Sequence, residues 1–362
     1  MTKEEICNIK SQQLNQLAEY RKELYTKPEL RKLFLELTLQ CNEHCFHCGS
    51  RCERETKDHG LPFEKYVEIL NEVKQNFDIR KIQLCITGGE PLLYPQFFEL
   101  MTYAHNLGFR WGMTSNGTLI TKEVAIKLRA AGMGTISISI DGLEETHDRL
   151  RGLAGGYQLA MKGIQHLIDE NYFHAIQVTT VVNRQNIEEL DALYEIFESV
   201  DIDSWRVIGL EPIGRALDYP GLMLTSSDQQ RLFQFIKEKR EAQIPVEYGC
   251  SHFLGLEYER EVRPWYFICG AGVCVAGIRA NGDIGACLDI DRCPETIQGN
   301  VFHDRFTDVW NNRFSTFRKP LSAQNENCLQ CSYEKWCAGG SHHSWNYNDN
   351  TQRICFKEVL FE

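Results

Sequence analysis

The sequence predicts an α/β fold, a partial (β/α)6 TIM-like barrel followed by an irregular C-terminal extension. Up to about residue 245, short β-rich runs alternate with longer segments of helical periodicity. Six such units imply parallel strands joined by right-handed crossovers, and they are too few for a closed barrel of eight units. From about Val246 onward the alternation stops, and short apolar stretches are separated by Gly, Asn, Asp and Cys.

The predicted elements follow one another in a regular order. Residues 1–30 read as a charged helical extension, residues 31–245 as the barrel and residues 246–362 as the C-terminal extension. The six pairs of strand and helix are 33–39 with 62–77, 82–87 with 97–107, 109–115 with 122–132, 136–140 with 157–170, 175–182 with 187–199, and 205–211 with 227–240. Ligands are expected at the C-terminal ends of these strands. The C-terminal extension cannot build much core, so we expect its fold to depend on metal.

The composition of the 362 residues excludes several classes of partner. With 39 basic and 50 acidic residues the formal net charge is −11, which offers no general attraction to nucleic acid or to an anionic membrane. No apolar run approaches the roughly 20 residues that span a bilayer. The N-terminus has no apolar signal segment, so we expect a cytoplasmic protein. In that compartment, 15 cysteines are better explained as metal ligands than as disulfides.

Three of these cysteines lie close together directly after the first predicted strand. Cys41, Cys45 and Cys48 form a CxxxCxxC motif. Three thiolates suit a 4Fe–4S cluster whose fourth iron has no protein ligand, with zinc ligation or burial in the core as the alternatives. Residues 88–91, Gly-Gly-Glu-Pro, end the second strand, where glycine lets a ligand approach the backbone closely. Cys85, within that strand, is expected in the core.

The CxxxCxxC loop together with the GGEP turn resembles the radical S-adenosylmethionine (SAM) superfamily. The resemblance implies that the cysteine loop holds a SAM-binding 4Fe–4S cluster. It also implies cofactor contacts at the strand ends, namely Gly88, Gly89, Glu90, Pro91, Ser115, Asn116, Ser139, Asp141 and Arg151, together with His47, which stands where the family usually has an aromatic residue. The alternatives are ordinary turns at 116–117 and 141–142 and a solvated ion pair for Arg151.

The remaining cysteine pattern lies in the C-terminal extension. Its order resembles the SPASM domain, the auxiliary iron–sulfur extension of certain radical SAM enzymes. The resemblance implies two further iron–sulfur clusters, three in all, with one on Cys328, Cys331, Cys337 and Cys355 and the other on Cys269, Cys274 and Cys287. Ser341 stands where the family has one more cysteine. We therefore expect an open or exchangeable iron in the first auxiliary cluster. The alternatives are ligation by Cys293, Ser341 or a nearby histidine, a 2Fe–2S centre, loss of this cluster, or zinc.

By the same resemblance the chain is expected to modify peptides. We expect reductive cleavage of SAM to a 5′-deoxyadenosyl radical, which abstracts hydrogen from a ribosomally made precursor peptide. An intramolecular thioether, ether or carbon–carbon cross-link is expected to follow. The expected partners are this peptide and an external electron donor such as flavodoxin or ferredoxin. Because only about thirty residues precede the first strand, leader binding is assigned to the barrel, the C-terminal extension or a separate leader-binding protein.

Other functions fit the same residues. A peptide epimerase would need a thiol that returns hydrogen to the α-carbon, and Cys250 is the candidate donor, with Cys52 and Cys293 also left over. A maturase that oxidises a sulfatase is a second alternative, which Ser341 disfavours. A non-catalytic iron–sulfur or zinc scaffold is a third alternative, and the intact CxxxCxxC and GGEP motifs argue against it.

Overall fold

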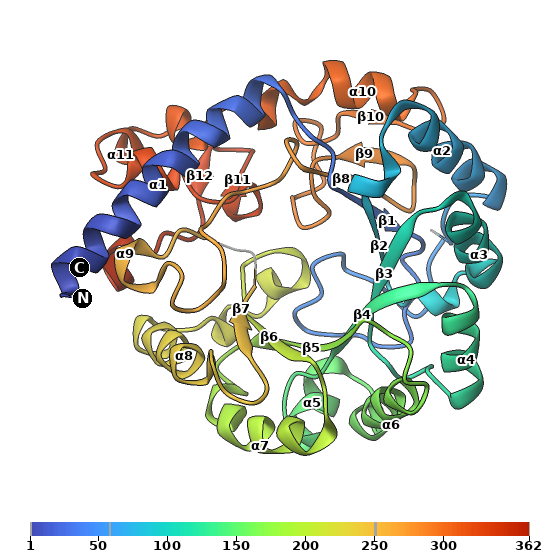
Figure 1. Cartoon of the computed structure of the whole chain (residues 1–362). Helices are drawn as coiled ribbons and strands as arrows, with labels where there is room; N and C mark the ends of the chain where they lie inside the picture. Colours follow the sequence, from blue (N-terminus) through green and yellow to red (C-terminus); the bar gives the residue numbers. More distant parts are fainter. Residues whose placement is uncertain (1, 58, 250–251, 362) are drawn as a thin grey trace.

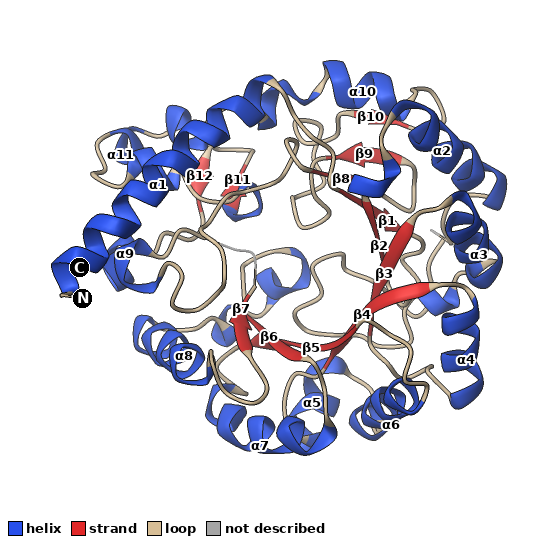
Figure 2. Ribbon diagram, in the orientation of Figure 1, coloured by secondary structure: helices blue, strands red, loops and turns tan. Residues whose placement is uncertain are grey.

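A ten-stranded, curved sheet organises the chain. The computed structural model describes residues 2–57, 59–249 and 252–361, so Cys250 lies outside the described residues. The strands follow the order β10-β9-β8-β1-β2-β3-β4-β5-β6-β7. Most helices lie on the outer side of the sheet (Figures 1 and 2). The prediction of a partial barrel with an appended C-terminal segment is confirmed.

Six βα units form the barrel, as the sequence predicts. The strands are β1 (Lys32–Glu36), β2 (Gln83–Thr87), β3 (Arg110–Ser115), β4 (Met133–Ser139), β5 (Ala175–Val182) and β6 (Ser204–Gly209). The helices are α2 (Phe63–Asn76), α3 (Phe97–Leu107), α4 (Lys122–Ala130), α5 (Glu144–Arg151), α6 (Gly156–Asp169), α7 (Leu190–Val200) and α8 (Ser226–Lys239). Each strand pairs in parallel with the next. The C-terminal ends of all six strands therefore meet at one edge of the sheet.

The two faces of the barrel strands differ in polarity. Along β2, Leu84 and Ile86 are buried, whereas Gln83 and Cys85 are only half-buried. Because successive side chains point to opposite faces, Gln83 and Cys85 lie on the inner face, away from the helices. Gln83 Nε2 donates to Thr135 Oγ1 at 3.4 Å on this face. The expectation of a core position for Cys85 is wrong, because only the outer face of β2 is covered by helices.

Helix α5 was not anticipated from the sequence. Its residues are almost all polar and give no apolar periodicity that would predict a helix. The helix ends at Gly152, whose φ of 65° is a left-handed conformation that glycine adopts without strain. Its last turn accepts hydrogen bonds from the cysteine loop, which fixes α5 against the candidate site.

The sheet continues into the C-terminal extension. β7 (Val246–Tyr248) pairs in parallel with β6, and β8 (Val275–Ile278) pairs in parallel with β1. β9 (Asp283–Gly285) and β10 (Gly299–Asn300) add antiparallel strands beyond β8. The remaining elements are α9 (Gly255–Tyr258), α10 (Phe306–Asn312), α11 (Glu326–Leu329), α12 (Glu334–Cys337), β11 (Trp345–Asn346) and β12 (Thr351–Gln352). The predicted domain boundary at residue 245 stays a prediction, since one sheet runs across it.

The N-terminal helix α1 (Lys3–Thr26) lies across the C-terminal extension (Figure 1). Arg21 donates to the carbonyl oxygens of Lys335 and Trp336, both at 2.7 Å. Trp336 Nε1 in turn donates to Asn15 Oδ1 at 3.0 Å. The first helix therefore supports the segment that carries the last cysteines. Among the described residues, no helix is both long enough and apolar enough to cross a membrane.

Candidate functional site

The CxxxCxxC loop lies at the C-terminal edge of the barrel, between β1 and α2. Backbone hydrogen bonds fix it to the last turn of α5. The His44 amide donates to the Arg151 carbonyl oxygen at 2.9 Å, and the Phe46 amide donates to the Leu150 carbonyl oxygen at 3.0 Å. The loop is therefore held in place by the barrel itself.

Arg215, just after β6, binds the other side of the cysteine loop. Its guanidinium donates to the carbonyl oxygens of Cys45 and Cys52, both at 2.6 Å, and to Glu53 Oε1 at 2.8 Å. Gly214 allows this close approach, because a Cβ there would lie 2.3 Å from a carbonyl oxygen of the loop. Arg215 was not among the site residues predicted from the sequence. The available signal was a Gly-Arg pair following a barrel strand at the ligand-bearing edge.

The two glycines of the GGEP turn let the end of β2 pack on the cysteine loop. A Cβ on Gly89 would lie 2.1 Å from the Gln40 carbonyl oxygen. The Gly89 amide donates to the Thr38 carbonyl oxygen at 2.7 Å, and the Glu90 amide donates to the Gln40 carbonyl oxygen at 2.9 Å. Glycine is needed here because the two backbones touch.

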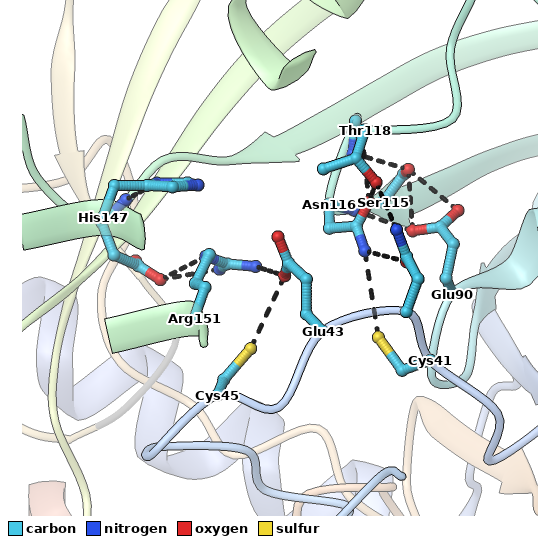
Figure 3. A network of polar contacts seen from close by, with 12 residues as sticks. Cys41, Glu43, Cys45, Glu90, Ser115, Asn116, Thr118, His147 and Arg151 are labelled. Carbon is cyan, nitrogen blue, oxygen red and sulfur yellow. Dashed lines mark hydrogen bonds and ion pairs between the residues drawn. The ribbon is translucent and has the colours of Figure 1, made fainter. Parts of the chain in front are cut away.

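Glu90 organises the third strand end (Figure 3). Its buried carboxylate accepts from the Ser115 hydroxyl at 3.0 Å and from the Asn116 amide at 2.9 Å. Asn116 Nδ2 donates to Asn42 Oδ1 at 2.8 Å and lies 3.8 Å from Cys41 Sγ. Burial raises the pKa of Glu90 to about 7, against the lowering effect of these donors. Glu90 therefore links the GGEP turn, the third strand end and the first thiol.

A second buried network joins the fourth strand end to the cysteine loop (Figure 3). Arg151 donates to Glu43 Oε2 at 2.8 Å and contacts Asp141 Oδ2 at 2.7 Å. His47 Nε2 lies 2.9 Å from the same Asp141 oxygen. Burial alone would raise the pKa of Asp141, but Arg151 and His47 hold it well below its usual range. Arg151 is thus a buried bridge between two carboxylates, and a solvated ion pair is excluded.

The residues around the thiols fit a bound ligand. Three buried atoms, Glu43 Oε1, His47 Nδ1 and His147 Nε2, make no hydrogen bond within the part of the chain that the structure describes. Buried polar atoms are normally satisfied, so these atoms indicate a polar ligand at this position. Burial raises the pKa of the Cys41 thiol to about 12. A cationic iron centre would stabilise its thiolate. The donor set therefore fits a cluster together with SAM.

Most of the predicted cofactor residues come together in these two networks. Glu90, Ser115 and Asn116 meet on one side of the cysteine loop, and His47, Asp141 and Arg151 meet on the other. Pro91 is buried and begins a short helical turn. Ser139 lies half-buried at the end of β4, in register with Thr179. Their contacts with cofactor stay predictions.

The four thiols assigned to one auxiliary cluster lie near one another. Burial, and then the neighbouring Cys355 and Cys328, raise the pKa of Cys337 to about 12. Burial, Cys355 and Cys331 likewise raise the pKa of Cys328 to about 11. Thiolates influence one another in this way only across short separations. This arrangement supports the predicted set, whose role as iron ligands stays a prediction.

The three thiols of the first auxiliary set approach one end of the β8–β9 pair. Cys269 and Cys274 flank a turn in which the Cys274 amide donates to the Gly270 carbonyl oxygen at 2.8 Å. Cys274 directly precedes β8, and Cys287 follows the antiparallel strand β9, which places both at the same end. Their role as iron ligands also stays a prediction.

Two of the alternatives for the missing ligand have different surroundings. Ser341 is fully buried, and its hydroxyl oxygen lies 3.2 Å from His343 Nε2. Burial raises the pKa of Tyr347, and the nearby thiolates of Cys269 and Cys293 raise it further. Cys293 therefore shares a neighbour with a predicted ligand. The Ser341 hydroxyl is engaged with a histidine.

Comparisons with known proteins show to which family the chain belongs. Residues 35–197 match the model of the radical SAM superfamily, and residues 269–332 match SPASM, an iron–sulfur cluster-binding domain. The mycofactocin maturase of Mycolicibacterium smegmatis is 30% identical, over 84% of this chain and 76% of its own length. The chain belongs to the radical SAM superfamily. Another radical SAM relative, the AdoMet-dependent heme synthase of Methanosarcina barkeri, is 28% identical over 85% of this chain and 90% of its own length.

Solved structures share the radical SAM fold. The structure of Streptococcus suis SuiB bound to S-adenosylmethionine matches 90% of this chain and 77% of its own, with a TM-score of 0.69 and 22% identity. The structure of anSMEcpe with bound AdoMet matches 91% of this chain and 92% of its own, with a TM-score of 0.69 and 20% identity. This radical SAM protein is therefore an enzyme that uses SAM and iron–sulfur clusters and carries a SPASM domain.

Proposed function

We propose that this enzyme is a peptide maturase that removes hydrogen from a ribosomally made precursor peptide and installs an intramolecular thioether, ether or carbon–carbon cross-link. The observation that carries the proposal is the buried site at the edge of the barrel, where the three thiols, the Glu90 network and the Arg151 network converge. The likeness of this chain to a mycofactocin maturase, over most of its length, supports a peptide substrate.

Each part of the site has a role in this proposal. Cys41, Cys45 and Cys48 hold the 4Fe–4S cluster, and residues 88–91 receive the SAM amino group. When bound, the cluster supplies the electron that cleaves SAM to methionine and a 5′-deoxyadenosyl radical. Glu90 keeps the first thiol loop and the third strand end together, because its amide donates to the Gln40 carbonyl oxygen and its carboxylate accepts from Ser115 and Asn116.

The fourth strand end positions SAM through Arg151. The Asp141 carboxylate accepts from Arg151 and from the Val181 amide, at 2.8 and 2.7 Å, and it also contacts His47. Asp141 is therefore a positioning residue that acts through Arg151 and His47. Glu43 Oε1, His47 Nδ1 and His147 Nε2 are the buried atoms left to contact the ligand. Ser139 and Asn116 complete the proposed set on the ribose side.

The SPASM domain adds a second site of electron transfer. Two auxiliary clusters, on the two thiol sets of the C-terminal extension, would accept the electron left on the substrate after hydrogen removal, which suits net oxidation. A cavity of about 180 Å³ lies between Gly49, directly after the cysteine loop, and Leu288, directly after Cys287. We assign this cavity to the path of the peptide, because it joins the two cluster regions. A flavodoxin or ferredoxin would supply the reducing electron, and a separate protein would present the leader.

A tetrapyrrole substrate is the second candidate. AdoMet-dependent heme synthases from three organisms are 27–28% identical to this chain, and the matches cover 82–90% of their own lengths. The same matches cover 85–88% of this chain. An iron porphyrin must therefore be tested beside the peptide.

The test is reconstitution of the full chain under anaerobic conditions with SAM and a reductant. Short peptides nominated by open reading frames next to this gene and a panel of iron porphyrins are offered in parallel, and products are read by mass spectrometry. A peptide product lighter by two hydrogens supports cross-linking. A peptide of unchanged mass that takes deuterium from heavy water at an α-carbon would establish epimerisation instead. A changed porphyrin would replace the peptide proposal, and absence of SAM cleavage would indicate a scaffold.

A further inference from the structure

Three buried side chains that the proposed function does not use converge near the C-terminal edge of the sheet. Glu211 follows β6, His252 follows β7, and His343 lies in the segment after α12. They are 8%, 3% and 9% exposed. Glu211 carboxylate oxygens lie 3.3 Å from His252 Nε2 and 3.0 Å from His343 Nε2. We call this group the Glu-His-His cluster.

The donor atoms of the cluster suit a single metal ion. The three atoms all lie within 4.8 Å of one another. One ion bonded to nitrogen and oxygen at about 2.0–2.2 Å can bridge such atoms after small side-chain rotations. Two imidazoles and one carboxylate are the protein ligands of many zinc centres and of mononuclear iron(II) centres. Thiolate, the ligand of the iron–sulfur clusters, is not part of this set.

The ion pairs with Glu211 leave one polar atom of the Glu-His-His cluster without a well-aligned hydrogen bond. His252 Nε2 makes no well-aligned hydrogen bond within the described residues, although it lies 3.3 Å from Glu211 Oε1. A contact of this length is weaker than a well-formed charge-assisted hydrogen bond, and positive charge stabilises a buried carboxylate. A divalent cation would satisfy both imidazoles and the carboxylate at once.

Space and a further oxygen donor lie beside the cluster. A cavity of about 10 Å³ borders Glu211 and His252 and is otherwise lined mainly by apolar side chains such as Leu232 and Phe233. This is about the space that one water needs. The Ser341 hydroxyl lies 3.2 Å from His343 Nε2. Water and this hydroxyl would complete a four- or five-coordinate ion. Ser341, the serine that replaces the expected cysteine, therefore lies next to the Glu-His-His cluster.

We propose that Glu211, His252 and His343 bind one divalent transition-metal ion, separate from the iron–sulfur clusters. The ion would join the end of the sixth barrel strand to the C-terminal extension, because its ligands come from both. The proposal does not depend on the substrate of the enzyme. It concerns a mononuclear site with nitrogen and oxygen ligands, within a chain whose other predicted metal ligands are thiolates.

The test uses the full chain with its clusters intact. Cobalt(II) and zinc(II) are titrated anaerobically, and metal is counted together with iron and sulfide. We expect one extra equivalent, with visible cobalt bands, in the wild type and in the control His303→Gln, whose side chain is exposed. The variants Glu211→Gln, His252→Gln and His343→Gln should lose the extra equivalent and keep their iron and sulfide.

X-ray absorption of the zinc-loaded wild type tests the site without any variant. A shell of light atoms at about 2.0–2.1 Å supports the proposal, whereas a sulfur shell at about 2.3 Å would place zinc on the cysteines and overturn it. Absence of an extra equivalent would show that the cluster is a buried ion pair only. Loss of about four irons from His343→Gln would show that this histidine ligates an iron–sulfur cluster instead.

Discussion

The two cysteine-rich regions are built in different ways. The first three thiols lie within residues 41–48, on a loop that Arg215, α5 and the end of β2 hold from three sides. The auxiliary thiols are spread over residues 269–355, among elements as short as α11 and α12, each of four residues. The barrel therefore organises the first site in advance, whereas we expect the C-terminal extension to depend on bound metal for much of its order.

The largest contrast is expected between Cys45→Ala and Cys331→Ala. Cys45→Ala should lower iron by about four per chain and abolish SAM cleavage, while thermal stability changes little, because the barrel still holds the loop. Cys331→Ala should also lose about four irons. It should keep SAM cleavage and lower the melting temperature, since the extension loses a metal. Iron and sulfide analysis, SAM cleavage and calorimetry measure these outcomes. Equal destabilisation by both variants would contradict the contrast.

The next effect concerns the buried bridge made by Arg151. Arg151→Met leaves the carboxylates of Glu43 and Asp141 buried without their cation, so we expect a loss of about 3–5 kcal/mol in the free energy of unfolding. Chemical denaturation measures it. Arg149→Met, on the same helix but half-exposed, is the matched control and should change stability by less than about 1 kcal/mol. Similar losses of unfolding free energy in both variants would show that the buried Arg151 bridge contributes no more to stability than an exposed ion pair does.

A pH-dependent effect of similar size is expected from Glu90. Burial raises the folded-state pKa of Glu90 from 4.5 to about 7, so the folded protein keeps a proton that the unfolded chain has released. Stability from this group is complete below pH 4.5 and falls by about 3 kcal/mol as the pH rises to about 7. Glu90→Gln should remove this dependence, because its side chain cannot ionise. Denaturation of both proteins at pH 5 and pH 7.5 measures the difference, and parallel pH profiles would contradict it.

The smallest effect concerns the contact between α1 and the C-terminal extension. Arg21→Ala removes the charged donor from two partly buried hydrogen bonds, those to the carbonyl oxygens of Lys335 and Trp336. We expect a loss of about 1–3 kcal/mol, confined to the segment around the last cysteines. Hydrogen exchange locates it, and SAM cleavage should be unchanged. The exposed neighbour Lys22→Ala is the control. Faster exchange in the barrel would show that the two regions are not independent.

The sequence was sufficient for features that depend on local pattern. Alternating periodicity predicted the six βα units, and spacing predicted the thiol loop and the GGEP turn that packs on it. Features that depend on distant contacts were missed. Helix α5 carries no apolar periodicity and Arg215 only a Gly-Arg pair after a strand, and they matter because they contact the cysteine loop from other parts of the chain. Cys85 was misplaced because the inner face of a partial barrel is not filled like a core.

The parallel pairing of β8 with β1 has a consequence for any shortened chain. β1 would be an edge strand of the barrel if β8 did not cover it from Lys32 to Leu35. An uncovered edge offers unpaired backbone groups to other molecules. Removal of the C-terminal extension would therefore expose a template for intermolecular strand pairing. The C-terminal extension therefore protects the barrel from aggregation in addition to carrying the auxiliary thiols.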